Sequence, residues 1–226
     1  MGAMGRPARV DLGGYVYHVL NRGNGRTPIF LKDGDYEAFL RIASEALEHV
    51  PGMRLLSYCL MPNHVHIVAV PSDPDGLWRT FLRLHRDYTG FINARMRVTG
   101  HLWQGRYGSV AMDEPHFVTA LRYVALNPVR ARLATRAQDW EWSSTRALIA
   151  GQDTRFVKVG PALERVGDFA AFLGQEFDEA MTYAALRKAE SIGRPCGSGE
   201  WLAEIEARTG LTIIPQKRGP APKVRS

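Results

Sequence analysis

The sequence predicts an α+β fold in which helices pack against one face of an antiparallel sheet, in a ferredoxin-like or RRM-like arrangement. The main observation is the order of segments, which reads strand, helix, strand, strand, helix, strand, helix. The chain of 226 residues is also 45% hydrophobic, enough to bury a sizeable core and to exclude global disorder. We expect one domain over 1–150, followed over 151–226 by a mostly helical extension with a flexible basic tail.

The first half of this order begins with a strand over 15–20, which is rich in aromatic and β-branched residues and runs into a Gly/Asn turn. A helix is expected over 35–50, because apolar residues recur there with helical spacing until Pro51-Gly52. Strands over 54–60 and 64–70 follow, joined by a connection of hairpin length. These segments predict the centre of the sheet.

The second half begins with an amphipathic helix over 77–96, in which one face is apolar and another carries arginines. A strand is expected over 107–112. Asp113-Glu114-Pro115 then provides suitable chemistry for the start of a helix over 116–126. We see no internal repeat and no long linker.

The net charge of +6 is unevenly distributed along the chain. Residues 77–108 carry six arginines against one acid, whereas 162–208 carry nine acids and five bases. Such clustering is typical of a nucleic-acid binder, although any single cluster is also consistent with a solvated charged face. No apolar run approaches the length of a membrane span and no secretory segment is evident, so we expect a cytoplasmic protein.

His64 and His66 form a His-x-His pair on the predicted strand 64–70. Residues two apart on a strand leave the same face about 6 to 7 Å apart along the strand, which suits two imidazoles binding one metal ion. The pattern alone is weak, since two partly exposed sheet histidines would look the same. The prediction of a metal site therefore requires a third ligand or another functional residue besides these two histidines.

Tyr123 and Asn127 are four residues apart on the last predicted helix and therefore share a face. A tyrosine at helical spacing is more often a packing residue than a nucleophile, because its hydroxyl is weak without assistance. Asn127 precedes Pro128, so an alternative is that it caps a second helix over 129–133. Taken singly, each residue has an ordinary explanation.

Four blocks together resemble a known family. They are Tyr15-Val16-Tyr17-His18-Val19 with Asn21-Arg22-Gly23-Asn24, Met61-Pro62-Asn63-His64-Val65-His66-Ile67-Val68, Gly100-His101-Leu102-Trp103-Gln104-Gly105-Arg106-Tyr107, and Leu121-Arg122-Tyr123-Val124-Ala125-Leu126-Asn127-Pro128. Their content and order are similar to REP-associated tyrosine transposases, single-tyrosine members of the His-hydrophobic-His nuclease superfamily related to the insertion-sequence-200 transposases. The Gly219-Pro220-Ala221-Pro222-Lys223 segment departs from the family's tail pattern, because it lacks an arginine after the glycine.

The resemblance implies a metal-dependent single-strand DNA endonuclease and strand transferase that acts on hairpin-forming repetitive extragenic palindromes through a 5′-phosphotyrosine intermediate. Tyr123 would be the nucleophile. His64, His66 and Asn127 would bind Mg²⁺ or Mn²⁺, which suits nitrogen and amide oxygen ligands beside a phosphate. The family's REP-associated members are expected to act as monomers, whereas insertion-sequence relatives work as dimers.

Residues that would contact DNA combine positive charge with stacking and hydrogen-bonding groups. The candidates are Arg6, Arg9, Arg22, Arg79, Arg83, Arg86, His101, Trp103, Gln104, Arg106, Arg122 and Arg130. For Trp103 the alternative is packing in the core, and for the amino-terminal arginines and the basic tail it is a solvated terminus.

Two other functions are compatible with these residues. One is a domesticated repeat-binding protein whose chemistry is idle. The other is an unrelated metal-dependent RNA-binding or phosphodiesterase domain, which would use water instead of tyrosine as the nucleophile. Covalent attachment of DNA to Tyr123 would distinguish the strand transferase from both of these alternatives.

Overall fold

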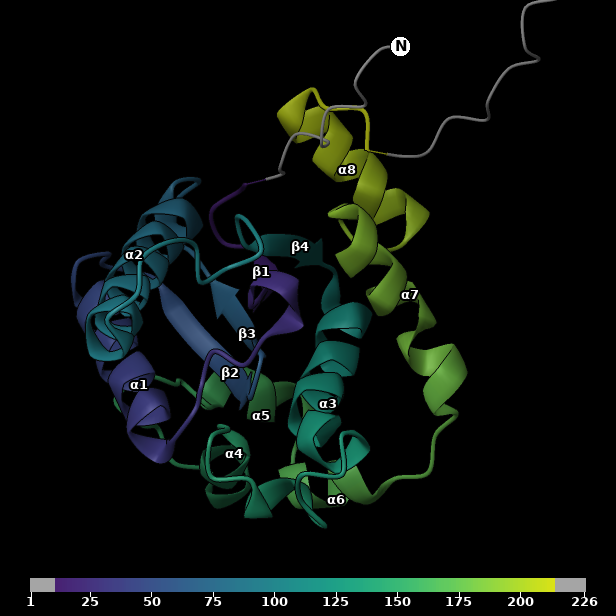
Figure 1. The fold of residues 1–226 in the computed structure, drawn as a ribbon. Helices are drawn as coiled ribbons and strands as arrows, with labels where there is room; N and C mark the ends of the chain where they lie inside the picture. Colours follow the sequence, from purple (N-terminus) through teal and green to yellow (C-terminus); the bar gives the residue numbers. More distant parts are fainter. Residues whose placement is uncertain (1–10, 214–226) are drawn as a thin grey trace, which may run out of the picture.

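The structure is a computed structural model that describes residues 11–213, and it contains a four-stranded sheet in the order β2-β3-β1-β4 (Figure 1). The strands are β1 (Val16–Arg22), β2 (Arg54–Met61), β3 (His64–Val70) and β4 (Gly108–Met112). Every neighbouring pair is antiparallel. This confirms the predicted α+β fold and its antiparallel sheet.

The helices lie between the strands and after them. They are α1 (Asp33–Glu48), α2 (Gly76–Met96), α3 (Glu114–Arg130), α4 (Thr145–Ala150), α5 (Gly160–Val166), α6 (Phe169–Gly174), α7 (Glu179–Ile192) and α8 (Gly199–Thr209), with short 3₁₀ turns at Asn24–Arg26 and Ala137–Asp139. The prediction of a mostly helical extension is confirmed over its described part. No helix between residues 11 and 213 is long and apolar enough to cross a bilayer.

Helices cover both faces of the sheet, which extends the expectation of helices on one face. The helices α1 and α2 pack on each other. They cover the face of the sheet from which Asn21 projects, because the Nδ2 atom of Asn21 lies 3.3 Å from Nδ1 of His85 on α2. Tyr123 on α3 packs instead against His18 and His66, whose side chains leave the opposite face. Figure 1 shows α1 and α2 on one side of the strands and α3 on the other.

The helices after residue 150 add to the α3 side. α3 contacts α5, α6 and α7, and backbone bridges join Leu55 to Val157 and Met112 to Cys196. Residues from both predicted domains share one buried core cluster, which includes Val157, Phe169 and Tyr183. The C-terminal helices are therefore part of the same packed structure as the sheet.

The alternative in which Asn127 caps a second helix is wrong. The helix α3 continues through Pro128 and ends at Arg130. A proline inside a helix loses one backbone hydrogen bond, and here the loss falls in the last turn, where the helix is about to end. Asn127 therefore stays on the same helical face as Tyr123.

Candidate functional site

His64 and His66 project from one face of β3, as the alternation of a strand requires. Their ring centroids lie 4.9 Å apart with nearly perpendicular planes. His66 is buried and His64 is partly buried at the start of the strand. The predicted pair therefore exists, and we call these two residues the histidine pair.

Each member of the histidine pair uses its Nδ1 atom to contact a neighbouring side chain. The Nδ1 atom of His66 lies 2.9 Å from Nε2 of His18 on β1, and the two rings stack at 5.1 Å. The Nδ1 atom of His64 lies 2.6 Å from the side-chain oxygen of Asn63. These contacts orient both imidazoles and leave their Nε2 atoms for another partner.

Both imidazoles are held in the neutral form. Burial, together with the positive charge of Arg22, lowers the pKa of His64 to about 4. Burial and the neighbouring histidines and arginines lower the pKa of His66 well below its ordinary value. A neutral imidazole is the form that binds a metal ion.

Tyr123 lies beside the histidine pair. The edge of its ring meets His66 at 5.5 Å and His18 at 6.0 Å between centroids, in nearly perpendicular arrangements. Its side chain reaches this position because α3 crosses the face of the sheet from which the histidines project. Two of the predicted site elements, far apart in sequence, are thus brought together within one chain.

The other side of Tyr123 is covered by Arg130 and α7. The Arg130 guanidinium stacks 4.2 Å from the centroid of the Tyr123 ring and donates a hydrogen bond to the Tyr123 carbonyl. Tyr183 meets the Tyr123 ring at 5.0 Å, and Glu179 forms an ion pair with Arg130 at 3.3 Å. Only 8% of Tyr123 is exposed, so its ring is fixed by packing.

Asn127, the third predicted ligand, lies one helical turn after Tyr123 on α3. Its Nδ2 atom is buried and makes no hydrogen bond to any described residue. Because rotation of an amide exchanges its nitrogen and oxygen, this side chain has a polar end that is not committed to another contact. No three His, Cys, Asp or Glu side chains form a metal-binding group within residues 11–213. The amide oxygen of Asn127 is a ligand type that suits Mg²⁺ or Mn²⁺, and the two imidazoles would add nitrogen ligands beside it.

The predicted arginine stripe lies on α2, where acids offset part of its charge. Arg79 forms an ion pair with Asp73 at 2.7 Å, and Arg86 and Arg83 lie 2.8 Å and 3.7 Å from Asp87. All three arginines are at least partly exposed. They remain available to a phosphate that competes with these exposed carboxylates.

The segment 101–106 runs beside the end of β1. Trp103 forms a bridge with Gly23, and Gln104 N donates to the Arg22 carbonyl. His101, Gln104 and Arg106 are exposed, whereas Trp103 is 8% exposed and its Nε1 atom donates to the His85 carbonyl. The packing role considered for Trp103 is therefore real.

Two of the arginines expected at the DNA are engaged in contacts between helices, Arg122 buried and Arg130 partly buried. The guanidinium of Arg122 stacks on Phe172 and Phe177 and donates to the Phe172 carbonyl, so it holds α6 against α3. Arg130 is occupied by Tyr123 and Glu179, as described above. Burial leaves Arg122 poorly placed for DNA, whereas Arg130 lies beside Tyr123. Arg6, Arg9 and the basic tail lie outside the described residues.

Three residues at the site were not identified from sequence as functional. His18 orients His66, Asn63 orients His64, and Tyr183 packs on Tyr123. His18 and Asn63 do fall within the sequence blocks that carry the family resemblance. No sequence signal identifies Tyr183, because its contact depends on how α7 folds back onto α3.

Two solved structures are similar to this chain. A REP-associated tyrosine transposase bound to a REP hairpin is similar over 70% of this chain and 92% of its own, with 17% identity and a TM-score of 0.55. A protein described as a transposase from Deinococcus radiodurans covers 55% of this chain and 95% of its own, with 18% identity and a TM-score of 0.37. No curated protein matches the sequence.

The sequence itself carries a family match. The model of the family described as "Transposase IS200 like" matches residues 12–127, which are 116 of the 226 residues. The matched span includes β1 with His18, the histidine pair, and α3 as far as Asn127. The chain therefore belongs to the IS200-like transposase family.

Proposed function

We propose that this protein is a metal-dependent single-strand DNA endonuclease and strand transferase that acts on hairpin-forming repetitive palindromes through a 5′-phosphotyrosine. The observation that carries the proposal is the contact of Tyr123 with His66, at 5.5 Å between ring centroids. A tyrosine beside two neutral, uncommitted imidazole nitrogens is the arrangement that phosphoryl transfer to tyrosine needs. The hairpin substrate is supported by the fold shared with the hairpin-bound transposase.

In this reaction the Tyr123 hydroxyl oxygen attacks the scissile phosphorus. The new bond joins that oxygen to phosphorus, the bond from phosphorus to the 3′ oxygen breaks, and the departing oxygen takes a proton to become a 3′-hydroxyl. The phenolic proton leaves to water. Because the phosphotyrosine keeps the energy of a phosphodiester, a 3′-hydroxyl can reverse the step or join a different end without a nucleotide triphosphate.

The chain's own residues fix the geometry of this step. Arg130 stacks on the Tyr123 ring and supplies positive charge beside it, while His18 holds His66 in one orientation. His64, His66 and Asn127 would hold the divalent ion, which when bound supplies charge neutralisation at the phosphate oxygens. Preorganised groups of this kind reduce the reorganisation needed in the transition state.

The proposal is tested by incubating the protein with a single-stranded hairpin labelled at its 3′ end, the end that stays on the covalently attached fragment, and Mn²⁺ or Mg²⁺, followed by denaturing electrophoresis. We expect a labelled band at the mass of the protein plus DNA. It should be absent in Tyr123→Phe and retained in Tyr183→Phe, a matched control that removes the hydroxyl of the neighbouring tyrosine.

Other outcomes separate the alternatives. Cleavage that persists in Tyr123→Phe without an adduct would overturn the tyrosine mechanism and favour a water nucleophile. Hairpin binding without cleavage or adduct in either metal would favour a repeat-binding protein whose chemistry is idle. An adduct that disappears in Tyr183→Phe and persists in Tyr123→Phe would reassign the nucleophile.

A further inference from the structure

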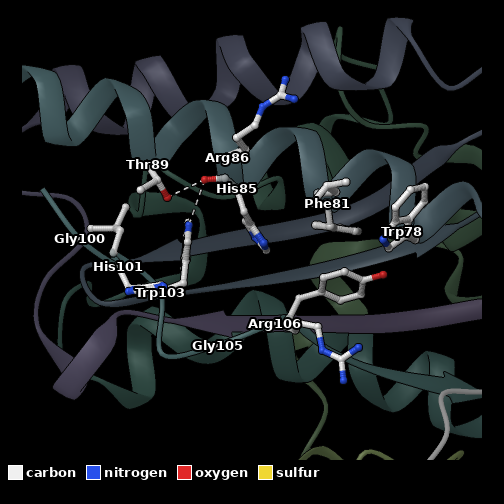
Figure 2. Close-up of a pocket in the computed structure, with 13 residues that line it drawn as sticks. Trp78, Phe81, His85, Arg86, Thr89, Gly100, His101, Trp103, Gly105 and Arg106 are labelled. Carbon is white, nitrogen blue, oxygen red and sulfur yellow. Dashed lines mark hydrogen bonds between the residues drawn. The ribbon is translucent and has the colours of Figure 1, made fainter.

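A hollow lies on the face of the sheet opposite to the face that Tyr123 covers. It is a cavity of about 470 Å³ between α2 and the segment 100–107, and most of its surface is apolar. Phe81 and His85 line it from α2, and Trp103 lines it from the segment (Figure 2). Tyr107 of the same segment also lines the cavity. We call it the apolar pocket.

The pocket is rich in ring systems and is open to solvent. Trp78 and Leu82, one turn apart on α2, are 52% and 50% exposed at its margin. The rings of His85 and Trp103 lie 4.4 Å apart, and those of Phe81 and Tyr107 lie 5.0 Å apart. Trp78 and Leu82 thus form an exposed apolar margin above the buried rings of Phe81, Trp103 and Tyr107, and an exposed apolar margin beside a hollow indicates a binding surface.

The charged groups of the pocket lie at its edges. Figure 2 shows the guanidiniums of Arg86 and Arg106 extending from opposite margins, away from the apolar interior. Arg106 makes no ion pair with any residue of the described part of the chain. An apolar interior with a cation on either side complements a planar base whose neighbouring phosphates lie outside.

The apolar pocket adjoins a second hollow that extends to Arg22 at the end of β1. This second, polar hollow of about 290 Å³, the polar cleft, shares Gly105 and Arg106 with the apolar pocket and is also lined by Arg22 and Gln104. Arg22 on β1 lies opposite His64 on β3, so its side chain projects from the same face of the sheet as the histidine pair. The polar cleft thus connects the two faces around the end of β1.

We propose that the apolar pocket binds one unpaired nucleobase of the single-stranded segment that flanks the hairpin. The backbone of that segment follows the polar cleft past Arg106 and Arg22 to the histidine pair, and the base enters between Trp78 and Trp103. This inference rests on the proposed function, because it requires a single-stranded DNA substrate. It adds a site on the other face of the sheet that anchors the strand before it reaches Tyr123.

The test is a binding assay with hairpin oligonucleotides that carry one abasic nucleotide at successive positions in the flanks, in the Tyr123→Phe background so that no cleavage occurs. Stacking on an aromatic side chain contributes about 1 to 3 kcal/mol per base. We therefore expect one flank position at which the abasic site weakens binding by about 5-fold to 150-fold. A fluorescent 2-aminopurine at that position should be quenched by the bound protein.

The same scan with Trp78→Ala and Leu82→Glu should lose this dependence, since the first removes a ring and the second places a carboxylate at the margin. Leu31→Glu is the matched control, because Leu31 is 52% exposed and does not line the pocket. Thermal unfolding shows whether each variant is folded. A folded Trp78→Ala or Leu82→Glu variant that keeps the wild-type dependence would overturn the proposal.

The result also separates this proposal from the proposed function. An adduct at Tyr123 together with equal effects of all flank positions would overturn the base pocket alone. Position-dependent binding without any adduct would support the pocket and count against strand transfer. A hairpin that does not bind at all would overturn both.

Discussion

The Nε2 atom of His18 lies 2.9 Å from the Nδ1 atom of His66, so a histidine of β1 fixes the orientation of a candidate metal ligand on β3. Both rings are buried and stack with a 12° angle between their planes. Residues that orient a ligand in this way typically change metal affinity or activity by about 10-fold to 100-fold when they are removed.

His18→Ala should therefore lower adduct formation about 10-fold to 100-fold and raise the Mn²⁺ concentration needed for half-maximal yield. His18→Gln should restore part of the loss, because a glutamine nitrogen or oxygen can reach the place of Nε2. His49→Ala, which removes an exposed histidine at the end of α1, is the control. An unchanged Mn²⁺ dependence in a folded His18→Ala would contradict the orienting role.

Arg130 connects Tyr123 to the C-terminal helices, with its guanidinium 4.2 Å from the Tyr123 ring and 4.8 Å from the Tyr183 ring. Arg130→Lys keeps the charge and loses the planar stack, so adduct formation should fall in both Arg130→Lys and Arg130→Ala. A desolvated cation–π contact contributes up to about 2 kcal/mol, and we expect a similar decrease in the free energy of unfolding for Arg130→Ala.

Glu179→Gln is the matched variant, since it leaves the ring stacking of Arg130 in place and removes the ion pairs of a half-exposed carboxylate with Arg130 and Arg187. Its effect on the free energy of unfolding should stay within about 1 kcal/mol. Chemical denaturation and the adduct assay measure both properties. Equal losses of adduct formation in Glu179→Gln and Arg130→Lys would show that charge pairing, and not stacking, positions Tyr123.

Local patterns were sufficient to predict the elements of the first half of the chain. Strand-type composition, turn residues and helical spacing identified β1 to β4 and α1 to α3 within a few residues of their ends, and the His-x-His spacing placed both imidazoles on one face. Such patterns report which side of an element is buried, which is local information.

The parts that were not predicted depend on contacts between distant segments. The burial of Arg122 against Phe172 and the cover of Tyr123 by Tyr183 arise where helices after residue 150 pack on α3. The pairing of His18 with His66 depends on the β1–β3 register, in which His18 lies opposite Val68 and Leu20 opposite His66. Spacing along one segment contains no information on such partners.

Asp113 joins the start of α3 to the start of α8. Its Oδ1 atom accepts from His116 N at 3.1 Å and contacts His116 Nδ1 at 2.5 Å, and its Oδ2 atom accepts from Ser198 N at 2.8 Å. Asp113→Ala should lower the free energy of unfolding at pH 7 by about 1 to 2 kcal/mol, because it removes a helix cap. Thermal or urea unfolding measures this loss.

The same carboxylate should contribute to pH dependence. Burial opposes its ionisation, but hydrogen bonds from His116 and Ser198 outweigh burial and lower the pKa of Asp113. A lowered pKa in the folded state stabilises the protein above the unfolded pKa of about 4, and this contribution is lost as the pH falls through the folded pKa. Asp113→Asn keeps a cap and cannot titrate, so its stability should decline less steeply on acidification than that of the wild type.

Positive charge along the proposed DNA path should make hairpin binding strongly dependent on salt. Each phosphate contact that is lost lowers the slope of log K against log salt by about 1, so Arg106→Gln should reduce the slope by about that amount. Arg41→Gln is the control, because it removes the same charge from α1, where Arg41 pairs with Glu45. Titrations of a labelled hairpin between about 50 and 200 mM salt measure both slopes. Equal slopes for the two variants would place the phosphates elsewhere, and a salt-independent wild-type affinity would argue against DNA as the ligand of this surface.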